Sequence, residues 1–239
     1  MEYGIQLFSV RDAFPGDIKG TLKALGEMGY SFVETAGFHG ADAETFADNL
    51  KASGMSLIAT HTPWEELAEN FGETVKFHKA IGNKNIVIPA ADLSTRQSLD
   101  SFIDFVNGVQ PKLREQGIDL HYHNHTQELI ANKDGIIPAA ELMSRTNLLL
   151  EVDTFFVYAV GQDPVDFLTR HKDRVRMIHL KDGLTEHEGR PLGQGSAPIE
   201  KVYRYALNRL AIIVESETLQ PDGLTEARLC IEYLRQLED

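Results

Sequence analysis

The chain alternates short apolar runs with longer segments in which apolar residues recur every three or four positions. The short runs have the length of buried strands, and the longer segments have the period of amphipathic helices. Eight of each follow one another at a mean spacing of about 30 residues, the size of one strand–helix unit. Runs such as Asn85–Ile88 and Ile212–Val214 are apolar on consecutive residues, as expected for parallel strands that are buried on both faces.

Each expected strand is followed by one expected helix. The strands span Tyr3–Phe8, Ser31–Glu34, Met55–Thr60, Asn85–Ile88, Ile118–His123, Asn147–Val152, Val175–Leu180 and Ala211–Glu215. The helices span Ile18–Met28, Ala43–Ala52, Trp64–Ile81, Thr95–Gln116, Gly135–Arg145, Pro164–His171, Ile199–Leu207 and Leu224–Leu237. Glycines follow several of these helices, as is typical of helix C-termini.

This repeat predicts an α/β fold, specifically an eight-stranded (β/α)8 TIM barrel, and a single domain over residues 1–239. No Gly-x-Gly-x-x-Gly motif follows the first strand, so a dinucleotide site has no support. A glycine-rich phosphate-binding loop is also missing, and no linker-like segment divides the chain.

The composition narrows the class of partner. The 239 residues include 23 Lys and Arg against 36 Asp and Glu, a formal net charge of −13. Such a surface repels phosphate backbones, and no run of basic residues offsets it, so nucleic acid is not an expected partner. No apolar run approaches the roughly 20 residues of a membrane span. The N-terminus does not resemble a secretory signal, and Cys230 has no second cysteine to pair with, so a cytoplasmic protein is expected.

Three histidines alternate in the segment Leu120-His121-Tyr122-His123-Asn124-His125. On a strand, His121, His123 and His125 would face one way, and Tyr122 and Asn124 the other. Imidazole is a common metal ligand and also titrates near neutral pH. The pattern alone is equally compatible with a metal site, a proton relay or a polar loop edge.

Other ligand-type residues stand where the expected strands end. They are Glu34, His61, His123, His125, Asp153, His179 and Glu215. The active sites of such barrels lie at the carboxyl ends of the strands. Four consecutive strands, the fifth to the eighth, each supply a candidate, so they could converge on one transition-metal ion.

Each candidate also has a structural interpretation. Asp153 could cap a turn before Thr154, His61 could be an ordinary loop residue, and Lys181 could be a surface lysine. We expect Glu151 to point outward toward a helix as an ion-pair partner, and Glu217 to be a weaker alternative to Glu215 as a ligand.

Several motifs in order resemble the sugar phosphate isomerase/epimerase family, which belongs to the xylose isomerase-like TIM barrel superfamily. They occupy residues 4–12, 33–40, 122–125, 151–154 and 178–183. The resemblance implies a metal set of a carboxylate, Asp, His and Glu from strands five to eight, and Asp153, His179 and Glu215 match it. On strand five this chain has His123 before Asn124-His125, so His123 is expected in place of the carboxylate, with His125 as the alternative.

The resemblance implies a divalent-metal-dependent sugar or sugar phosphate isomerase or epimerase that transfers a proton next to a carbonyl through an enediolate. One ion is expected, Mn²⁺ in preference to Zn²⁺, Co²⁺ or Fe²⁺. Glu215 is the first candidate base, and Glu34, His61 or His125 the second proton carrier. Lys181 would lie near developing oxyanion charge or a substrate phosphate. Substrate contacts are expected from His39, His125 and Lys181.

The alternatives are a dehydratase or β-eliminating lyase on inosose or 3-keto-sugar derivatives, an endonuclease IV-like repair enzyme, and a noncatalytic sugar-binding barrel. The negative charge argues against the repair enzyme. The expected partner is a small sugar or polyol, and the expected assembly is a monomer or homodimer. The long glycine-rich loop Asp182–Pro198 could act as a lid.

Overall fold

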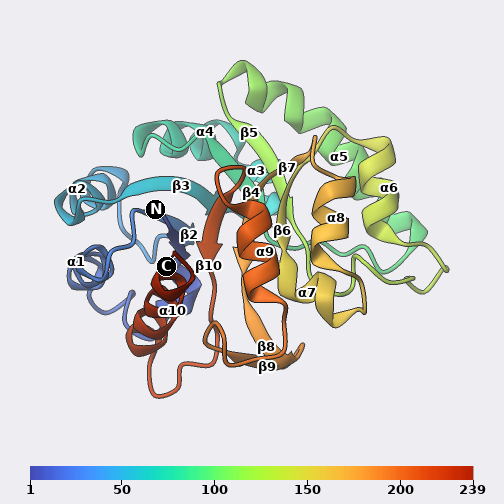
Figure 1. Cartoon of the computed structure of the whole chain (residues 1–239). Coiled ribbons are helices and arrows are strands. Elements are labelled where there is room, and N and C mark those ends of the chain that lie inside the picture. Colours follow the sequence, from blue (N-terminus) through green and yellow to red (C-terminus); the bar gives the residue numbers. More distant parts are fainter. Residues whose placement is uncertain (239) are drawn as a thin grey trace.

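A computed structural model describes residues 1–238 of the chain. Eight parallel strands close into a barrel in the order β1-β10-β7-β6-β5-β4-β3-β2, which confirms the predicted TIM barrel. The helices surround the strands, and the two termini lie close together beside α10 (Figure 1). None of the helices in residues 1–238 combines the length and apolar character needed to cross a membrane.

The barrel strands are short and buried. They are β1 (Gly4–Gln6), β2 (Phe32–Ala36), β3 (Ser56–His61), β4 (Asn85–Ile88), β5 (Asp119–His123), β6 (Leu149–Asp153), β7 (Val175–Leu180) and β10 (Ala211–Val214). Two further strands, β8 (Asp182–Thr185) and β9 (Glu188–Arg190), form an antiparallel hairpin after β7. The predicted lid loop therefore contains a small sheet.

Helices follow the strands around the outside. They are the 3-10 helix η1 (Leu7–Val10), then α1 (Ile18–Met28), α2 (Ala43–Ser53), α3 (Trp64–Glu69), α4 (Phe71–Ala80), α5 (Arg96–Glu115), α6 (Pro138–Arg145), α7 (Thr154–Ala159), α8 (Pro164–Arg170), α9 (Ile199–Ala206) and α10 (Gly223–Glu238). Gly29 ends α1 in the left-handed conformation (φ 107°), as its position in the sequence predicted.

Some local features differ from the sequence-based prediction. The first strand ends at Gln6, because the Gln6 side chain accepts the Phe8 N–H and starts η1. The helix predicted over Trp64–Ile81 is divided at Asn70, whose φ of −133° is not helical. The short helix α7 was not predicted; the Asp153 carboxylate caps it by accepting two backbone N–H groups.

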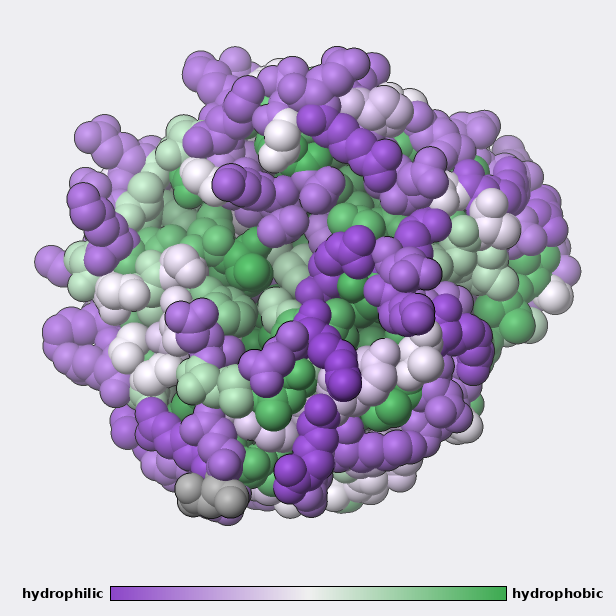
Figure 2. Space-filling model, turned by 45° about the horizontal axis from the view of Figure 1, so that its top comes forward, coloured by the Kyte–Doolittle hydropathy of each residue, from purple (hydrophilic) through white to green (hydrophobic). Residues whose placement is uncertain are grey.

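Side chains alternate between the barrel interior and the helix layer. One strand face contributes an apolar layer deep in the barrel, made of Phe32, Ala59, Val87, Met177 and Ile213. Successive inward residues on a strand are two apart, so the next inward positions on β2, β3 and β7 and directly after β10 are the polar residues Glu34, His61, His179 and Glu215. In the view of Figure 2, hydrophilic residues cover most of the periphery, and hydrophobic residues gather in the hollowed part near the centre.

Candidate metal and active site

Inward-facing residues at the carboxyl ends of the strands form one buried polar cluster. The cluster contains Glu34, His61, His123, Glu151, Asp153, His179, Lys181 and Glu215. The structure thus brings together, at one end of the barrel, six of the seven residues that the sequence placed at strand ends, all except His125. His121, two positions earlier on β5, lies below the cluster and hydrogen-bonds to Asn85.

The inner half of the cluster joins two buried carboxylates through imidazoles. Glu34 Oε2 lies 2.6 Å from His179 Nε2 and accepts a hydrogen bond of 2.8 Å from Gln6. Glu151 Oε2 lies 2.8 Å from His61 Nε2 and 3.2 Å from His179 Nε2. Among residues 1–238, no Lys or Arg lies within ion-pair distance of Glu34 or Glu151.

The two inner carboxylates differ in proton affinity. Burial, together with the facing Glu151 carboxylate, raises the pKa of Glu34 to about 7. Burial also acts to raise the pKa of Glu151, but the neighbouring imidazoles of His179, His123 and His61 outweigh it and hold that pKa well below its usual range. The inner cluster therefore favours one ionised carboxylate and one that titrates near neutrality.

Glu151 corrects the sequence analysis, which expected it to point outward. It is two residues before Asp153 on β6, and residues two apart on a strand share a face. Both side chains therefore enter the barrel and are fully buried. The two-residue alternation of side chains on a strand therefore predicts the inward position of Glu151 once Asp153 is taken to face inward.

The outer half of the cluster is balanced by a lysine. Lys181 Nζ donates to Glu217 Oε2 at 2.6 Å and Glu215 Oε2 at 3.2 Å, and lies 3.9 Å from Asp153 Oδ2. Burial favours the neutral amine, but the carboxylates outweigh it and hold the pKa of Lys181 above its usual value. Lys181 is 2% exposed, which excludes the surface-lysine interpretation.

Asp153 has one satisfied and one free oxygen. Its Oδ1 accepts the N–H groups of Phe155 and Phe156, whereas its buried Oδ2 has no hydrogen-bond partner. Burial raises the pKa of Asp153 to about 7, with Lys181 opposing the shift. The cap that the sequence offered as an alternative is thus present, and it leaves the second oxygen available as a ligand.

A cavity of about 390 Å³ lies over the cluster. Its lining includes His61, His123, His125, Glu215 and Glu217. A neighbouring cavity of about 450 Å³ extends toward the β8–β9 hairpin and is lined by Lys181 and two arginines, Arg11 and Arg190. The two cavities share Phe8 and Glu217, and together they are called the mouth cavities below.

Two of the residues predicted to transfer protons or contact the substrate line neither of these cavities. Glu34 is fully buried beneath the cavity that lies over the cluster. His39 is on the exposed loop after β2, where its ring packs edge-on against Phe14, and it lines neither mouth cavity. Residues that the sequence analysis missed include Gln6, which holds Glu34, and Phe8, whose exposed ring lies between the cavities.

Two overlapping groups of side chains have the geometry to hold a metal ion. One is His123, Asp153, His179 and Glu215, the four residues predicted from the sequence; the other is His61, His123, Glu151 and His179. In each group the potential ligand atoms lie within 4.8 Å of one another. The unpartnered Asp153 Oδ2 and the mixed nitrogen and oxygen donors fit a divalent transition metal. His123 belongs to both groups, and His125 to neither.

A parallel α/β barrel with imidazoles and carboxylates beneath a cavity at the strand ends is the architecture of barrel enzymes with a metal centre. The family model described as "Xylose isomerase-like TIM barrel" matches residues 22–237, and the chain belongs to this family.

The chain is similar to enzymes of two classes. Inosose dehydratase from Geobacillus thermodenitrificans is 26% identical over 189 residues, and the match covers 72% of this chain and 57% of that protein. The chain therefore spans less than two thirds of the length of this relative. A sugar phosphate isomerase/epimerase from Parabacteroides distasonis superposes with a TM-score of 0.84 at 17% identity, covering 98% of this chain and 93% of that one. The probable 3-DHS dehydratase from Bacillus anthracis gives 0.79 at 12% identity, covering 98% and 99%. The family match and the similarity to inosose dehydratase support an enzymatic role, and the two superpositions show the shared fold.

Proposed function

We propose that this protein is a divalent-metal-dependent sugar isomerase or epimerase that moves a proton next to a carbonyl of a sugar, sugar phosphate or polyol derivative. The observation that carries the proposal is the buried group His123, Asp153, His179 and Glu215. Two of its members, His123 and Glu215, line the mouth cavity of about 390 Å³. The similarity to a sugar phosphate isomerase/epimerase supports the substrate class.

His123, Asp153, His179 and Glu215 would hold the ion, with Mn²⁺ preferred and Zn²⁺, Co²⁺ or Fe²⁺ as alternatives. When bound, the ion supplies Lewis acidity that makes the hydrogen next to a substrate carbonyl more acidic. Glu34 and Glu151 sit behind His179 and orient its ring, as carboxylates commonly do for metal-ligating histidines. We therefore assign Glu34 a positioning role instead of proton transfer.

Glu215 is the proposed base. It lines the cavity, and this position carries the assignment. Burial acts to raise its pKa, but Lys181 and His179 hold that pKa well below its usual range, so the carboxylate is in the ionised form that a base requires. Lys181 keeps this charge in place and faces the neighbouring cavity, where it could also contact a substrate oxygen.

His61 and His125 are the proposed second proton carriers, because both line the same cavity. His61 reaches it from β3, on a part of the barrel wall separated from β10 by β1 and β2. Among residues 1–238, His125 Nδ1 is buried and has no hydrogen-bond partner. An imidazole on one side and Glu215 on another are the two groups that proton removal and return require.

The second candidate function is dehydration of an inosose or a 3-keto-sugar derivative. The similarity to inosose dehydratase favours it. The same base would remove the proton, and an imidazole such as His125 would protonate the departing hydroxyl group. Both functions therefore begin with removal of a proton, and they differ in whether the substrate then loses a hydroxyl group.

Incubation of Mn²⁺-loaded protein with ketoses and inososes in D₂O tests both functions. An isomerase or epimerase should give a sugar that has lost no atoms but has exchanged a hydrogen for deuterium. A dehydratase should give a product that has lost one molecule of water. Glu215→Gln should lose more activity than metal content, and Asp153→Ala and His179→Ala should lose both. Exposed Glu232→Gln, on α10, is the matched control. Full metal content in both Asp153→Ala and His179→Ala would contradict the proposed ligand set.

A further inference from the structure

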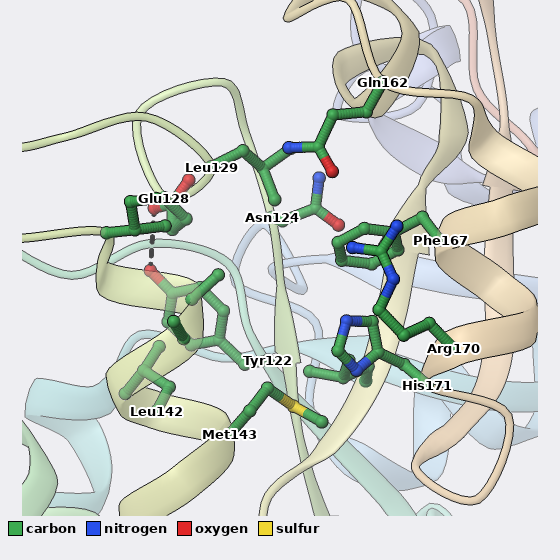
Figure 3. Close-up of a pocket in the computed structure, with 14 residues that line it drawn as sticks. Tyr122, Asn124, Glu128, Leu129, Leu142, Met143, Gln162, Phe167, Arg170 and His171 are labelled. Atoms are coloured by element: carbon green, nitrogen blue, oxygen red, sulfur yellow. Dashed lines mark hydrogen bonds between the residues drawn. The ribbon is translucent and has the colours of Figure 1, made fainter.

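A second kind of cavity lies on the outside of the barrel. It opens between α6 and α8 over the outer faces of β5 and β6, and its volume is about 260 Å³ (Figure 3). None of the residues that line it lines either mouth cavity. The alternation on β5 explains the separation, because Tyr122 and Asn124 face outward while His121 and His123 face the barrel interior.

One wall of this outer cavity is apolar. It is formed by Tyr122, Leu129, Leu142, Met143 and Leu150. The polar atoms in this wall are already engaged, since Tyr122 donates to Glu128 Oε1 at 2.9 Å (Figure 3). Glu128 Oε2 accepts the backbone N–H of His125 at 2.8 Å. An occupant of this side would therefore meet hydrocarbon and aromatic surface.

The opposite wall, on α8, carries positive charge. Figure 3 shows Arg170, Phe167, His171 and Gln162 on the same side of the cavity. Among residues 1–238, Arg170 makes no ion pair and no side-chain hydrogen bond, whereas Arg145 and Arg204, which are also exposed helix residues, pair with carboxylates. A guanidinium with its donors free thus lies at the edge of an apolar cavity.

We propose that the outer cavity binds a small carboxylic acid with an apolar body. The body would pack against Tyr122, Leu142 and Met143, and the carboxylate would pair with Arg170, whose fork of N–H groups suits two carboxylate oxygens. The volume is near the lower end of ligand sites, which fits one ring or a short chain. A sugar fits this cavity less well than such an acid, because the apolar wall offers no partners to the hydroxyl groups that would face it.

The site is independent of the proposed activity, and direct binding tests it. The probe is 4-fluorobenzoate, followed by ¹⁹F NMR on the purified protein, with 4-fluorobenzyl alcohol as the neutral analogue. We expect the acid to bind about fivefold more tightly than the alcohol, because an ion pair with an exposed guanidinium such as that of Arg170 is worth about 1 kcal/mol. Arg170→Gln should remove this preference, and Arg228→Gln, an exposed arginine on α10, should retain it.

A second variant separates loss of charge from loss of the site. Ala140 is exposed on α6 and lines the cavity, so Ala140→Trp should fill the cavity without disturbing the core and abolish binding of both probes. The proposal is overturned by equal affinity for acid and alcohol, or by no binding at about 10 mM probe. It is also overturned if 4-fluorobenzoate binds Ala140→Trp and Arg170→Gln as tightly as the parent.

Discussion

Replacing Lys181 with methionine tests how charge is balanced in the outer half of the cluster. The Lys181 ammonium is the one Lys or Arg group within 4 Å of Glu215 and Asp153 among residues 1–238, at 3.2 Å and 3.9 Å. Methionine keeps a similar apolar stem and removes the charge. Glu217 also loses its partner, but its side chain is 36% exposed and can be hydrated.

The expected loss depends on whether a divalent ion is bound. Removing one member of a buried ion pair costs about 3–5 kcal/mol, because the remaining charge is left unpaired. This loss is expected in the presence of a chelator. An ion held by Asp153 and Glu215 would supply the missing positive charge, and the loss should then fall to about 1 kcal/mol, the value of an exposed pair such as that with Glu217.

The difference between the stability lost without the ion and the stability lost with it equals the change in the affinity of the protein for the ion, expressed as a free energy. Anything that binds only the folded state stabilises it in proportion to its binding free energy. The variant should therefore bind the ion more tightly than the parent by about 2–4 kcal/mol, or about 30-fold and more. The physical reason is that the ion no longer competes with an ammonium group for the same carboxylates.

Urea unfolding followed by circular dichroism, in EDTA and in saturating Mn²⁺, measures the two losses, and competition with a chromogenic chelator measures the affinity. Lys201→Met, which breaks an exposed pair with Asp163, is the control and should lose less than about 1 kcal/mol in both conditions. If Lys181→Met loses equal stability with and without Mn²⁺, or binds Mn²⁺ more weakly, Asp153 and Glu215 do not hold the ion. The inner group with Glu151 would then be the site.

Three further predictions concern neighbouring residues. Asn124→Ala should weaken metal binding about tenfold in a chelator competition, because its side chain holds both the N–H and the C=O of Asp153. Burial lowers the pKa of His78 to about 4, so the stability it contributes is complete above pH 6.5 and is lost as the pH falls toward 4. When the pH is lowered from 7 to 5, the free energy of unfolding measured with urea should fall by about 2 kcal/mol less in His78→Gln than in the parent. An equal fall in both proteins would contradict the lowered pKa of His78. His123→Ala should lose bound metal in elemental analysis whereas His125→Ala retains it, and the reverse result would make His125 the ligand.

The face of each strand-end residue could be predicted from the sequence because the rule is local. Parallel strands end on the same side of the barrel, and side chains alternate with a period of two residues. These two facts place His123, Asp153 and His179 on one surface without knowledge of distances. The same rule places Glu151 on the inward face with Asp153, so the outward position expected for Glu151 was inconsistent with the rule itself.

Distances across the barrel could not be predicted in this way. Glu34 and His179 are 145 residues apart, and their contact of 2.6 Å depends on how the closed sheet staggers β2 against β7. The break at Asn70 and the early end of β1 at Gln6 likewise depend on single backbone conformations and side-chain hydrogen bonds. Apolar periodicity carries no information about either feature.

The imidazole of His179 contacts carboxylates of both halves of the cluster. His179 Nδ1 lies 3.2 Å from Glu215, and its Nε2 lies 2.6 Å from Glu34. If Nδ1 serves the ion, Nε2 must carry the ring proton and donate it to an inner carboxylate. The inner carboxylates would then act through the ring by fixing its tautomer and orientation. Position at a strand end predicted Glu34 as a proton carrier, whereas its contact with His179 supports the positioning role that we propose for it.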